Sequence, residues 1–315
     1  MGKDPPVSEK VLIALGTFCE SGRRPLDELE ASGRPFVLNQ YKRRLVPEEI
    51  VELGRDCAGI VAGVEPYTRE VLEALPELRV VSRCGVGVDN VDLDAARERG
   101  VAVRNTPDVV VQPVAEMTLA VVLDLMRRLT VQTAAMKAGR WEKHTGNLLA
   151  GKTVGVVGLG RIGRRVAELF AAVGAEVVGA DPMCDADWAG RVGVGVCDLG
   201  KLLAAADVVS VHVAAPKDVP FRLGAAEFAA MRPGAYFVNM ARGAYVDEDA
   251  LYDALASGRV AGAGLDVFSA EPYTGRLLEL ENVVCTPHVA TLTHESRLRM
   301  EVEAVLNCLD ALGAG

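Results

Sequence analysis

A glycine-rich loop between a strand and a helix is the feature that most narrows the range of folds. Residues 152–163 read KTVGVVGLGRIG, in which Gly158, Gly160 and Gly163 have the spacing GxGxxG. The first glycine of such a loop permits a tight turn, the second lets an anionic ligand approach the backbone, and the third lets the helix pack closely on the strand. The amides at the start of the helix then face the anion. The loop therefore predicts a strand–loop–helix unit that binds a phosphate-bearing ligand.

Short apolar strands alternate with helices along the rest of the chain. A second series begins at Thr153, and the amino-terminal series has strands near residues 11–15, 36–38, 60–62, 80–82 and 101–103. This alternation is typical of parallel sheets that are covered by helices on both faces. A chain of 315 residues corresponds to about two domains. We therefore expect an α/β protein with two doubly wound parallel-sheet domains.

A long apolar helix is predicted between the two series, from Val114 to Leu129. Its apolar residues lie on nearly all sides until Arg127 and Arg128, so most of its surface is expected to be buried. Such a helix either crosses between domains or packs against a second subunit.

An acidic residue follows the glycine loop at the distance expected for a ribose-binding group. Asp181 ends the next apolar strand, about 20 residues after the loop. A carboxylate there accepts hydrogen bonds from the ribose hydroxyls and repels a 2′-phosphate, and neither Pro182 nor Met183 supplies the cation that a 2′-phosphate requires. The loop and the acid together predict a Rossmann domain that binds NAD rather than NADP.

The charge and composition of the chain argue against several other classes of protein. The formal net charge is -9 and no extended run of basic residues is present, which disfavours nucleic-acid binding. No apolar stretch reaches the roughly 18 residues needed to span a bilayer, so no membrane partner is expected. The 7 cysteines are scattered singly without a CxxC pair. We therefore predict neither a disulfide framework nor a metal site, and we expect a cytoplasmic protein.

Polar side chains follow three buried strands of the second series. Arg242 lies in FVNMARGAYVDE, Asp266 and Glu271 lie in GLDVFSAEP, and His288 lies in VVCTPHVA. Ligands of doubly wound sheets bind beyond the carboxyl ends of the strands, so these side chains are expected to converge, with Glu271 behind His288. Taken singly, each residue is also common in a solvated turn or loop. Their joint order after the glycine loop favours a shared site.

These residue types suit hydride transfer between a 2-hydroxy acid and a nicotinamide. A guanidinium such as Arg242 grips a substrate carboxylate with two hydrogen bonds. A histidine is the natural general base for the hydroxyl proton near neutral pH, and the general acid in the reverse direction. A neighbouring carboxylate fixes its tautomer and orientation. The predicted function is that of an oxidoreductase acting on the CH–OH group of a small 2-hydroxy acid, with His288 as the acid/base.

The chain resembles the D-2-hydroxyacid dehydrogenase family, in particular its phosphoglycerate dehydrogenase-like branch. The resemblance extends from Ile60 to Leu306 and is carried by SRCGVGVDNVDLDAARERG, NTP at 105–107, VAE at 114–116, GLGRIG, NMARG, LDVFSAEP and TPHVA. It implies that Arg242, Glu271 and His288 are the catalytic residues of an NAD-dependent D-2-hydroxyacid dehydrogenase.

The resemblance also implies roles for the residues around this group. Val86 and Gly87 would bind the substrate carboxylate through their backbone amides, together with Arg242, and Asp266 would hold the nicotinamide carboxamide. The full set of cofactor-binding residues implied in this way is Gly158, Gly160, Arg161, Ile162, Gly163, Asp181, His212, Val213, Ala241, Asp266 and His288.

The family's organisation implies a discontinuous domain. A flavodoxin-like substrate domain would comprise residues 1–106 and 287–315, and a Rossmann NAD-binding domain, residues 107–286, would be inserted into it. The long apolar helix matches the family's dimer-forming element, so a homodimer is expected.

The substrate is left open because the amino-terminal part departs from the phosphoglycerate pattern. Phosphoglycerate enzymes often carry an arginine after the strand at Gly59–Ala62, whereas this chain reads AGVEPYT there, with Glu65. Arg83, Arg104 or the cluster Lys42-Arg43-Arg44 would have to replace that arginine. Two alternatives follow: an oxidoreductase of the same family with a phosphonate-bearing or other atypical substrate, and an NAD(H)-sensing binding protein like the family's corepressors.

Overall fold

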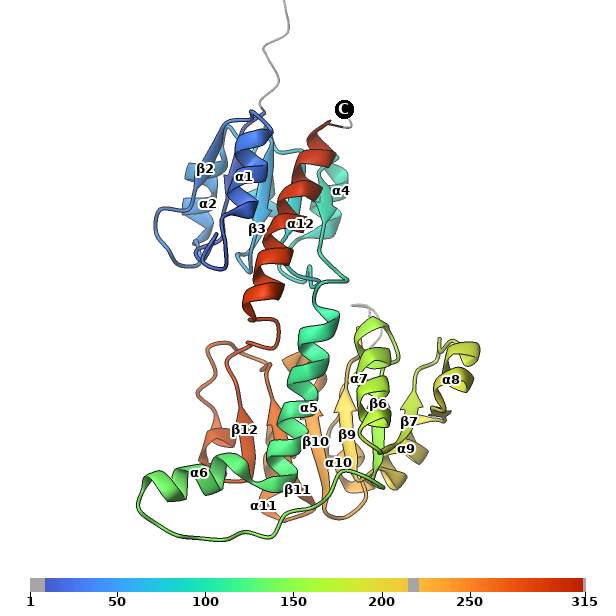
Figure 1. Cartoon of the computed structure of the whole chain (residues 1–315). Helices are drawn as coiled ribbons and strands as arrows, with labels where there is room; N and C mark the ends of the chain where they lie inside the picture. The colour runs from blue at the N-terminus through green and yellow to red at the C-terminus, as the bar shows by residue number, and fades with distance from the viewer. Residues whose placement is uncertain (1–8, 215–220, 314–315) are drawn as a thin grey trace, which may run out of the picture. The chain divides into compact units, whose positions relative to one another are not determined.

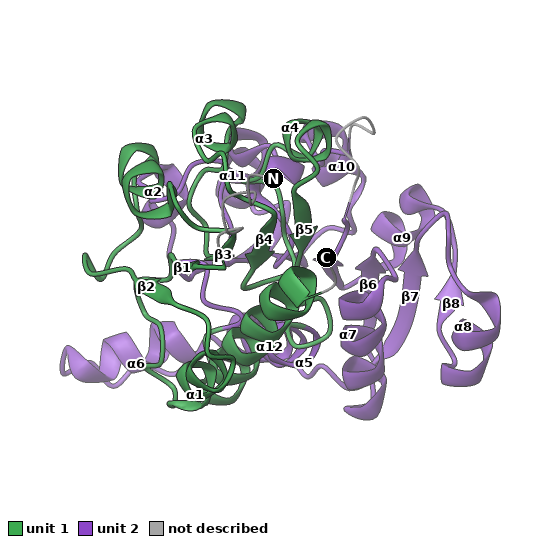
Figure 2. Cartoon of the chain, turned by 90° about the horizontal axis from the view of Figure 1, so that it is seen from above, with its two compact units in different colours: residues 1–110, 292–315 green, residues 111–291 purple. Residues whose placement is uncertain are grey.

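The computed structural model describes residues 9–214 and 221–313 and divides the chain into two compact units. Unit 1 comprises Met1–Val110 and Leu292–Gly315, and unit 2 comprises Val111–Thr291 (Figure 2). These boundaries lie a few residues after the boundaries that we predicted from the sequence, at residues 106 and 286. Thr106 exchanges hydrogen bonds with Gly85 in unit 1, whereas the amide of Ala290 is bonded to Asp266 in unit 2.

Unit 1 contains a five-stranded parallel sheet with the flavodoxin-like order β2-β1-β3-β4-β5. Helices α2, α3 and α4 cover one face of this sheet, and α1 and α12 cover the other (Figure 2). The strands are β1 Val11–Ile13, β2 Phe36–Leu38, β3 Gly59–Ala62, β4 Val80–Arg83 and β5 Ala102–Arg104. The helices are α1 Arg24–Ala31, α2 Pro47–Gly54, α3 Arg69–Glu73, α4 Leu93–Glu98 and α12 His294–Gly313.

Unit 2 contains a seven-stranded parallel sheet with the order β12-β11-β10-β9-β6-β7-β8. Counted from its own first strand, this is the Rossmann order with one strand added. The strands are β6 Thr153–Val157, β7 Glu176–Ala180, β8 Gly195–Val196, β9 Val208–Val211, β10 Ala235–Asn239, β11 Val260–Leu265 and β12 Val283–Cys285. The predicted pair of doubly wound parallel sheets is thereby confirmed.

Two apolar cores hold the helices of unit 2 to this sheet. Residues of α5 and α7 form one core with β6 and β10, and residues of α9, α10 and α11 form the other (Figure 1). The α-helices are α5 Val111–Arg127, α6 Leu129–Lys137, α7 Arg161–Ala172, α8 Ala186–Val192, α9 Leu199–Ala205, α10 Ala225–Ala230 and α11 Glu248–Ala256, and two short 3-10 helices are η1 Gly243–Tyr245 and η2 Arg276–Glu279.

The long helix that the sequence predicts over residues 114–129 is broken at Arg128. This residue has a left-handed backbone (φ 53°, ψ 41°), and α6 begins directly after it. The carboxylate of Asp124 accepts hydrogen bonds from the amide, at 2.8 Å, and from the hydroxyl of Thr130. The chain therefore turns because Asp124 satisfies donors in the first turn of a new helix, which an apolar pattern alone does not reveal.

A helix and a short strand that the sequence analysis did not predict follow β7. Asp185 caps α8 by accepting the amide of Trp188 at 3.0 Å, and the Trp188 side chain is buried. β8 has only 2 residues, too few for an alternating pattern.

In the part of the chain that the structure describes, no helix has both the length and the apolar character needed to cross a membrane.

The core of unit 2 offers a stability prediction at Phe237. Its side chain is 0% exposed and meets Phe228 edge to face, with ring centroids 5.3 Å apart. Phe237→Ala is expected to lower the free energy of unfolding by about 3–5 kcal/mol, because it leaves a cavity and removes the aromatic contact. Urea unfolding followed by the fluorescence of buried Trp188 measures the loss. Val196→Ala, on the exposed edge strand, should cost less than about 0.5 kcal/mol; equal losses would contradict this packing.

Candidate active site

The glycine loop joins β6 to α7 at the carboxyl edge of the unit 2 sheet. Gly158 has a φ of 92°, and a Cβ there would lie 2.8 Å from the backbone of His212. A Cβ at Gly163 would lie 1.8 Å from the carbonyl oxygen of Gly158. Only glycine therefore allows the helix to begin this close to the loop. A Cβ at Gly160, by contrast, would point into open space.

The open space at Gly160 leaves room for an anionic group beside the start of α7. Arg161 and Ile162 are the first residues of this helix, whose first-turn amides have no partner within the helix. Asp181, after β7, lies across the loop, where its carboxylate accepts the amides of Leu159 at 2.7 Å and Met183 at 2.8 Å. Each oxygen keeps a lone pair for a ribose hydroxyl. The loop, the amides and the acid fit a dinucleotide.

Uncharged side chains follow β9 and β10: His212 and Val213 after β9, and Ala241 after β10. His212 is 8% exposed, its Nε2 lies 2.7 Å from Ser210 Oγ, and its Nδ1 is buried with no hydrogen-bond partner among the described residues. Burial lowers the pKa of His212 to about 3, so the ring is neutral. Val213 packs against the apolar core and Ala241 is buried. A neutral wall of this kind suits the aromatic rings of a dinucleotide rather than its phosphates.

Asp266, directly after β11, holds the loop that carries His288. Its side chain is 1% exposed, and its carboxylate accepts three hydrogen bonds from the chain after β12. The donors are the hydroxyl of Thr286 at 2.6 Å and the amides of Val289 at 2.8 Å and Ala290 at 2.9 Å. A buried carboxylate requires such donors, because desolvation of an unpaired charge is costly. The backbone on both sides of His288 is thereby fixed.

His288 and Glu271 form a hydrogen-bonded pair. His288 has a φ of 55°, and its Nδ1 lies 2.9 Å from Glu271 Oε2. The other oxygen of Glu271 accepts the amide of Phe268 at 3.1 Å. The side chains of His288 and Glu271 are 47% and 39% exposed. With Nδ1 engaged by the carboxylate, Nε2 is the ring nitrogen left to exchange a proton with a ligand.

The loop carrying Arg242 is pressed against the loop carrying Glu271. A Cβ at Gly243 would lie 1.8 Å from the carbonyl carbon of Phe268, so the two backbones can touch only because residue 243 is glycine. Asn239, which ends β10, donates from its side chain to the Arg242 carbonyl at 2.8 Å. Together with the Glu271–His288 pair, this contact unites the loops after β10, β11 and β12. The three predicted catalytic residues therefore stand on loops that contact one another at one sheet edge.

Val86 and Gly87 belong to unit 1, where they follow β4. Asn105 donates from its side chain to the Val86 carbonyl at 2.7 Å, and Gly85, with a φ of 140°, makes the turn before them. Val86 is 36% exposed. Hydrogen bonds from Asn105 to Val86 and between Thr106 and Gly85 thus fix the backbone of this loop.

Sequence reasoning missed Thr286 and assigned no role to Asn239, although both orient the site rather than line it. Thr286 fixes the loop after β12 through its hydrogen bond to Asp266. Asn239 fixes the loop after β10 through its hydrogen bonds with Arg242 and Ala241. The available signal was a polar residue at the end of a buried strand, but that signal does not identify the partner. Among the described residues, no group of three or more histidine, cysteine or acidic side chains is arranged to hold a metal ion.

Comparison with known proteins places this geometry in a family. Residues 119–290 match the model "D-isomer specific 2-hydroxyacid dehydrogenase, NAD binding domain". The chain belongs to the D-isomer specific 2-hydroxyacid dehydrogenase family. The match covers the glycine loop, Asp181, Arg242, Glu271 and His288. The expected NAD-binding domain is confirmed, whereas the individual residue roles stay predictions.

Curated relatives and solved structures extend the similarity to both units. The chain is 39% identical over 266 residues to D-3-phosphoglycerate dehydrogenase of Archaeoglobus fulgidus, which covers 83% of this chain and 50% of that protein. The chain thus spans about half the length of the curated relatives it matches. The TT0316 protein from Thermus thermophilus has a TM-score of 0.88, with 35% identity and 97% of each chain covered. D-Lactate dehydrogenase from Aquifex aeolicus, complexed with NAD and lactic acid, has a TM-score of 0.83, with 28% identity and 95% and 94% covered.

The buried His212 should make the stability of unit 2 sensitive to acid. Its pKa of about 3 in the folded protein lies below the ordinary value of 6.5, so below pH 6.5 the unfolded chain binds a proton that the folded protein does not. Stability is therefore expected to fall as the pH drops from about 6.5 toward 3, by up to about 1.4 kcal/mol per pH unit. Urea unfolding between pH 4 and 7 measures the slope.

His212→Asn should remove this contribution to the slope, whatever its effect on stability at neutral pH. His294→Asn, at an exposed histidine, is the matched control and should leave the slope unchanged. Identical pH slopes for wild type and His212→Asn would show that His212 is not held neutral.

Proposed function

We propose that the protein is an NAD-dependent D-2-hydroxyacid dehydrogenase that interconverts a 2-hydroxy acid and its 2-oxo acid. The observation that carries the proposal is the hydrogen bond of 2.9 Å between Glu271 and His288. The loops that carry this pair contact the loop of Arg242, at the same sheet edge as the glycine loop. The family match supports the same chemistry.

NAD bound at the glycine loop would supply the hydride acceptor or donor. Gly160 leaves space for the pyrophosphate beside the close turn that Gly158 and Gly163 permit, the amides of Arg161 and Ile162 would face it, and Asp181 would bind the ribose. His212, Val213, Ala241 and Asp266 complete the predicted cofactor set. The side chain of Asp266 already accepts three protein hydrogen bonds, so a contact with the carboxamide uses a remaining lone pair.

His288 holds and moves the proton. In the neutral ring, Nδ1–H donates to Glu271 Oε2, so Nε2 accepts the hydroxyl proton during oxidation and returns it to the carbonyl oxygen during reduction. Glu271 stabilises the imidazolium that forms and keeps the ring in one orientation. The amide of Phe268 holds Glu271 in turn.

Recognition of the substrate carboxylate is assigned to Arg242 and to the amides of Val86 and Gly87. A guanidinium binds a carboxylate with two parallel hydrogen bonds, which also orients the reacting carbon. The Asn239 contact fixes the backbone from which Arg242 extends. The substrate is a small 2-hydroxy or 2-oxo acid. The phosphonate-bearing substrate and the NAD(H)-sensing role remain alternatives, and the assay below distinguishes them.

Replacement of His288 tests the mechanism. His288→Ala is expected to lower the rate of NADH oxidation with 2-oxo acids at least 100-fold, because the ring nitrogen that exchanges the proton is lost. NADH binding, measured by fluorescence titration, should persist, because the glycine loop and Asp181 are unchanged. The panel is glyoxylate, hydroxypyruvate, phosphohydroxypyruvate, 2-oxoglutarate and phosphonopyruvate.

His294→Ala is the matched control, since exposed His294 also follows β12 in sequence but belongs to α12. It should retain wild-type turnover. Full activity in His288→Ala would overturn the mechanism. Wild-type protein that binds NADH but turns over no acid in the panel would favour the sensing role.

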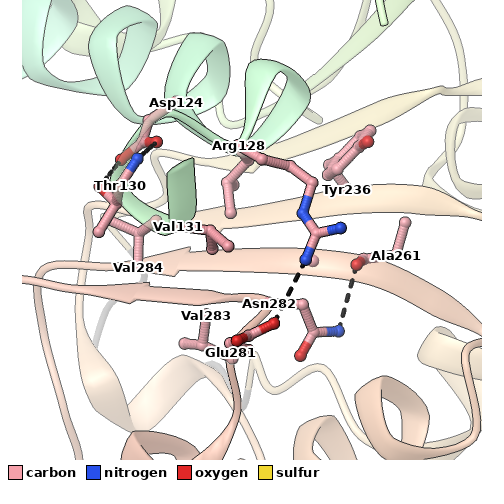
Figure 3. Close-up of a pocket in the computed structure, with 12 residues that line it drawn as sticks. Asp124, Arg128, Thr130, Val131, Tyr236, Ala261, Glu281, Asn282, Val283 and Val284 are labelled. Carbon is pink, nitrogen blue, oxygen red and sulfur yellow. Dashed lines mark hydrogen bonds and ion pairs between the residues drawn. The ribbon is translucent and has the colours of Figure 1, made fainter. Parts of the chain in front are cut away.

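The long apolar helix that the sequence assigns to the dimer is, as α5, largely buried in a core of unit 2, so we propose instead that a homodimer forms through residues 129–148, which follow it. Large apolar side chains are exposed along this segment: Leu129 52%, Met136 51%, Trp141 77% and Leu148 72%. Beside it lies a cavity of about 270 Å³ lined by Val131, Val283 and Val284, with the Arg128 side chain between Tyr236 and Glu281 (Figure 3). Several large exposed apolar side chains on one segment of the chain favour a protein–protein contact there.

A double substitution tests the interface. Trp141→Ser with Leu148→Ser is expected to convert the protein from dimer to monomer in light scattering, because it removes the two most exposed apolar side chains of the segment. Leu278→Ser, at a comparably exposed leucine on η2, should leave the mass unchanged. A wild-type monomer would contradict the proposal.

The cellular setting that we propose is the cytoplasm. All seven cysteines are free thiols, as is usual in a reducing compartment.

A further inference from the structure

The loop that carries Glu271 has two consecutive backbone amides, each of which donates to a glutamate. The amide of Phe268 donates to Glu271 Oε1 at 3.1 Å, and the amide of Ser269 donates to Glu248 Oε1 at 2.7 Å. Glu271 belongs to the same loop, whereas Glu248 is the first residue of α11. The second hydrogen bond therefore ties this loop to a different element of unit 2.

The start of α11 is a fixed point from which Glu248 extends. Asp247 precedes the helix and caps it, accepting the amide of Ala250 at 3.1 Å. The amide of Asp247 donates to the Leu223 carbonyl at 2.9 Å, and its carboxylate pairs with Arg222 at 3.2 Å. Because these contacts hold the residue before Glu248, Glu248 offers the loop a rigid anchor.

The peptide between Phe268 and Ser269 also touches the loop of Arg242. A Cβ at Gly243 would lie 2.3 Å from the Ser269 nitrogen, so the two backbones are in direct contact. Such a contact limits how near the peptide can come, but it does not orient the peptide. The hydrogen bond to Glu248 has a preferred direction and therefore supplies the orientation.

Side-chain packing contributes little to the position of this stretch. Ser269, Ala270 and Glu271 are exposed. Glu248 and Ser269 both line a cavity of about 260 Å³, together with Tyr273 and others. Because no close-packed core surrounds the Ser269 peptide, packing would not replace a lost hydrogen bond there. The contact between Glu248 and Ser269 is therefore expected to have a large influence on the loop.

We propose that Glu248 is a positioning residue, which holds Glu271 in place, and through it His288, by accepting the Ser269 amide. This inference rests on the proposed function and extends its machinery to α11. Glu271 follows Ser269 by two residues, and its Oε2 lies 2.9 Å from His288 Nδ1. Loss of the Ser269 hydrogen bond would let the loop shift, and a displacement of about 1 Å can cost up to about 100-fold in rate. Glu248 itself needs no contact with NAD or substrate.

Three substitutions of Glu248 separate the hydrogen bond from the charge. Glu248→Ala removes the acceptor and should lower kcat about tenfold, with KM for NADH and for the 2-oxo acid within about twofold of wild type. Glu248→Gln keeps an acceptor oxygen at the same reach without the charge, so it should retain at least about half of the wild-type kcat. Glu248→Asp keeps the charge but withdraws the oxygen, so it should resemble Glu248→Ala. The substrate is the acid of the panel that wild-type protein reduces fastest.

Asp249→Ala is the matched control. Asp249 is exposed, stands beside Glu248 in the first turn of α11 and lines the same cavity. Its removal therefore changes the charge at this helix terminus as Glu248→Ala does, and it should leave kcat at the wild-type value. An equal loss in Asp249→Ala and Glu248→Ala would assign the effect to the helix terminus and overturn the proposal.

A double substitution shows whether Glu248 acts through Glu271. Glu271→Ala alone is expected to lower the rate of hydride transfer, measured in single turnovers so that a slow residual rate is detected. Adding Glu248→Ala should lower that rate no further, because the group that Glu248 positions is already gone. The same tenfold loss in both backgrounds would show a general structural role and overturn the proposal, as would wild-type kcat in Glu248→Ala.

Two remaining outcomes keep the test decisive. If Glu248→Ala does not fold, the comparison of Glu248→Gln with Glu248→Asp decides, and equal impairment of these two variants would overturn the proposal. Wild-type protein that binds NADH but reduces no acid of the panel would overturn the proposed function itself, and this inference with it.

Discussion

The buried carboxylate of Asp266 is the contact on which the geometry of the active-site edge depends. At 1% exposure it cannot rely on water, so its charge requires protein donors, and all three come from the chain after β12. This requirement fixes residues 286–290 relative to β11. His288 then projects from a backbone held on both sides. The proposed catalytic pair, His288 and Glu271, can therefore be partly exposed without losing its orientation.

Close contacts between loop backbones, together with these hydrogen bonds, fix the position of the active-site loops. Parallel strands bring their carboxyl ends to one edge, but neighbouring loops meet closely only where side chains are absent. Gly243 against Phe268 and Gly163 against Gly158 are two such places. The first unites the loop of Arg242 with that of Glu271, and the second sets the helix start against the dinucleotide loop. Hydrogen bonds to a buried acid and missing Cβ atoms thus position reactive groups that belong to separate stretches of sequence.

The sequence could predict the architecture because continuous apolar strands, helix periodicity and the glycine spacing are local signals. Each signal indicates where a strand or a helix begins. Parallel pairing of β10, β11 and β12 then places Arg242, Glu271 and His288 at one edge of the sheet. The break at Arg128 was not predictable from periodicity, since it depends on Asp124 bonding Thr130. The burial of Glu65 and the pairing of Arg297 with Glu301 were equally hidden, because both depend on how the loops of unit 1 pack with a helix from the far end of the chain.

The division of the chain into two units suggests why one chemistry accommodates different substrates in this family. This chain is similar both to a D-3-phosphoglycerate dehydrogenase and to a D-lactate dehydrogenase, whose named substrates differ in a phosphate. The proposed proton-transfer pair of His288 and Glu271 and the residues that support it lie wholly within unit 2, and none of them is predicted to contact the far end of a substrate. Discrimination between substrates with different far ends must therefore come from residues other than this pair and its supports.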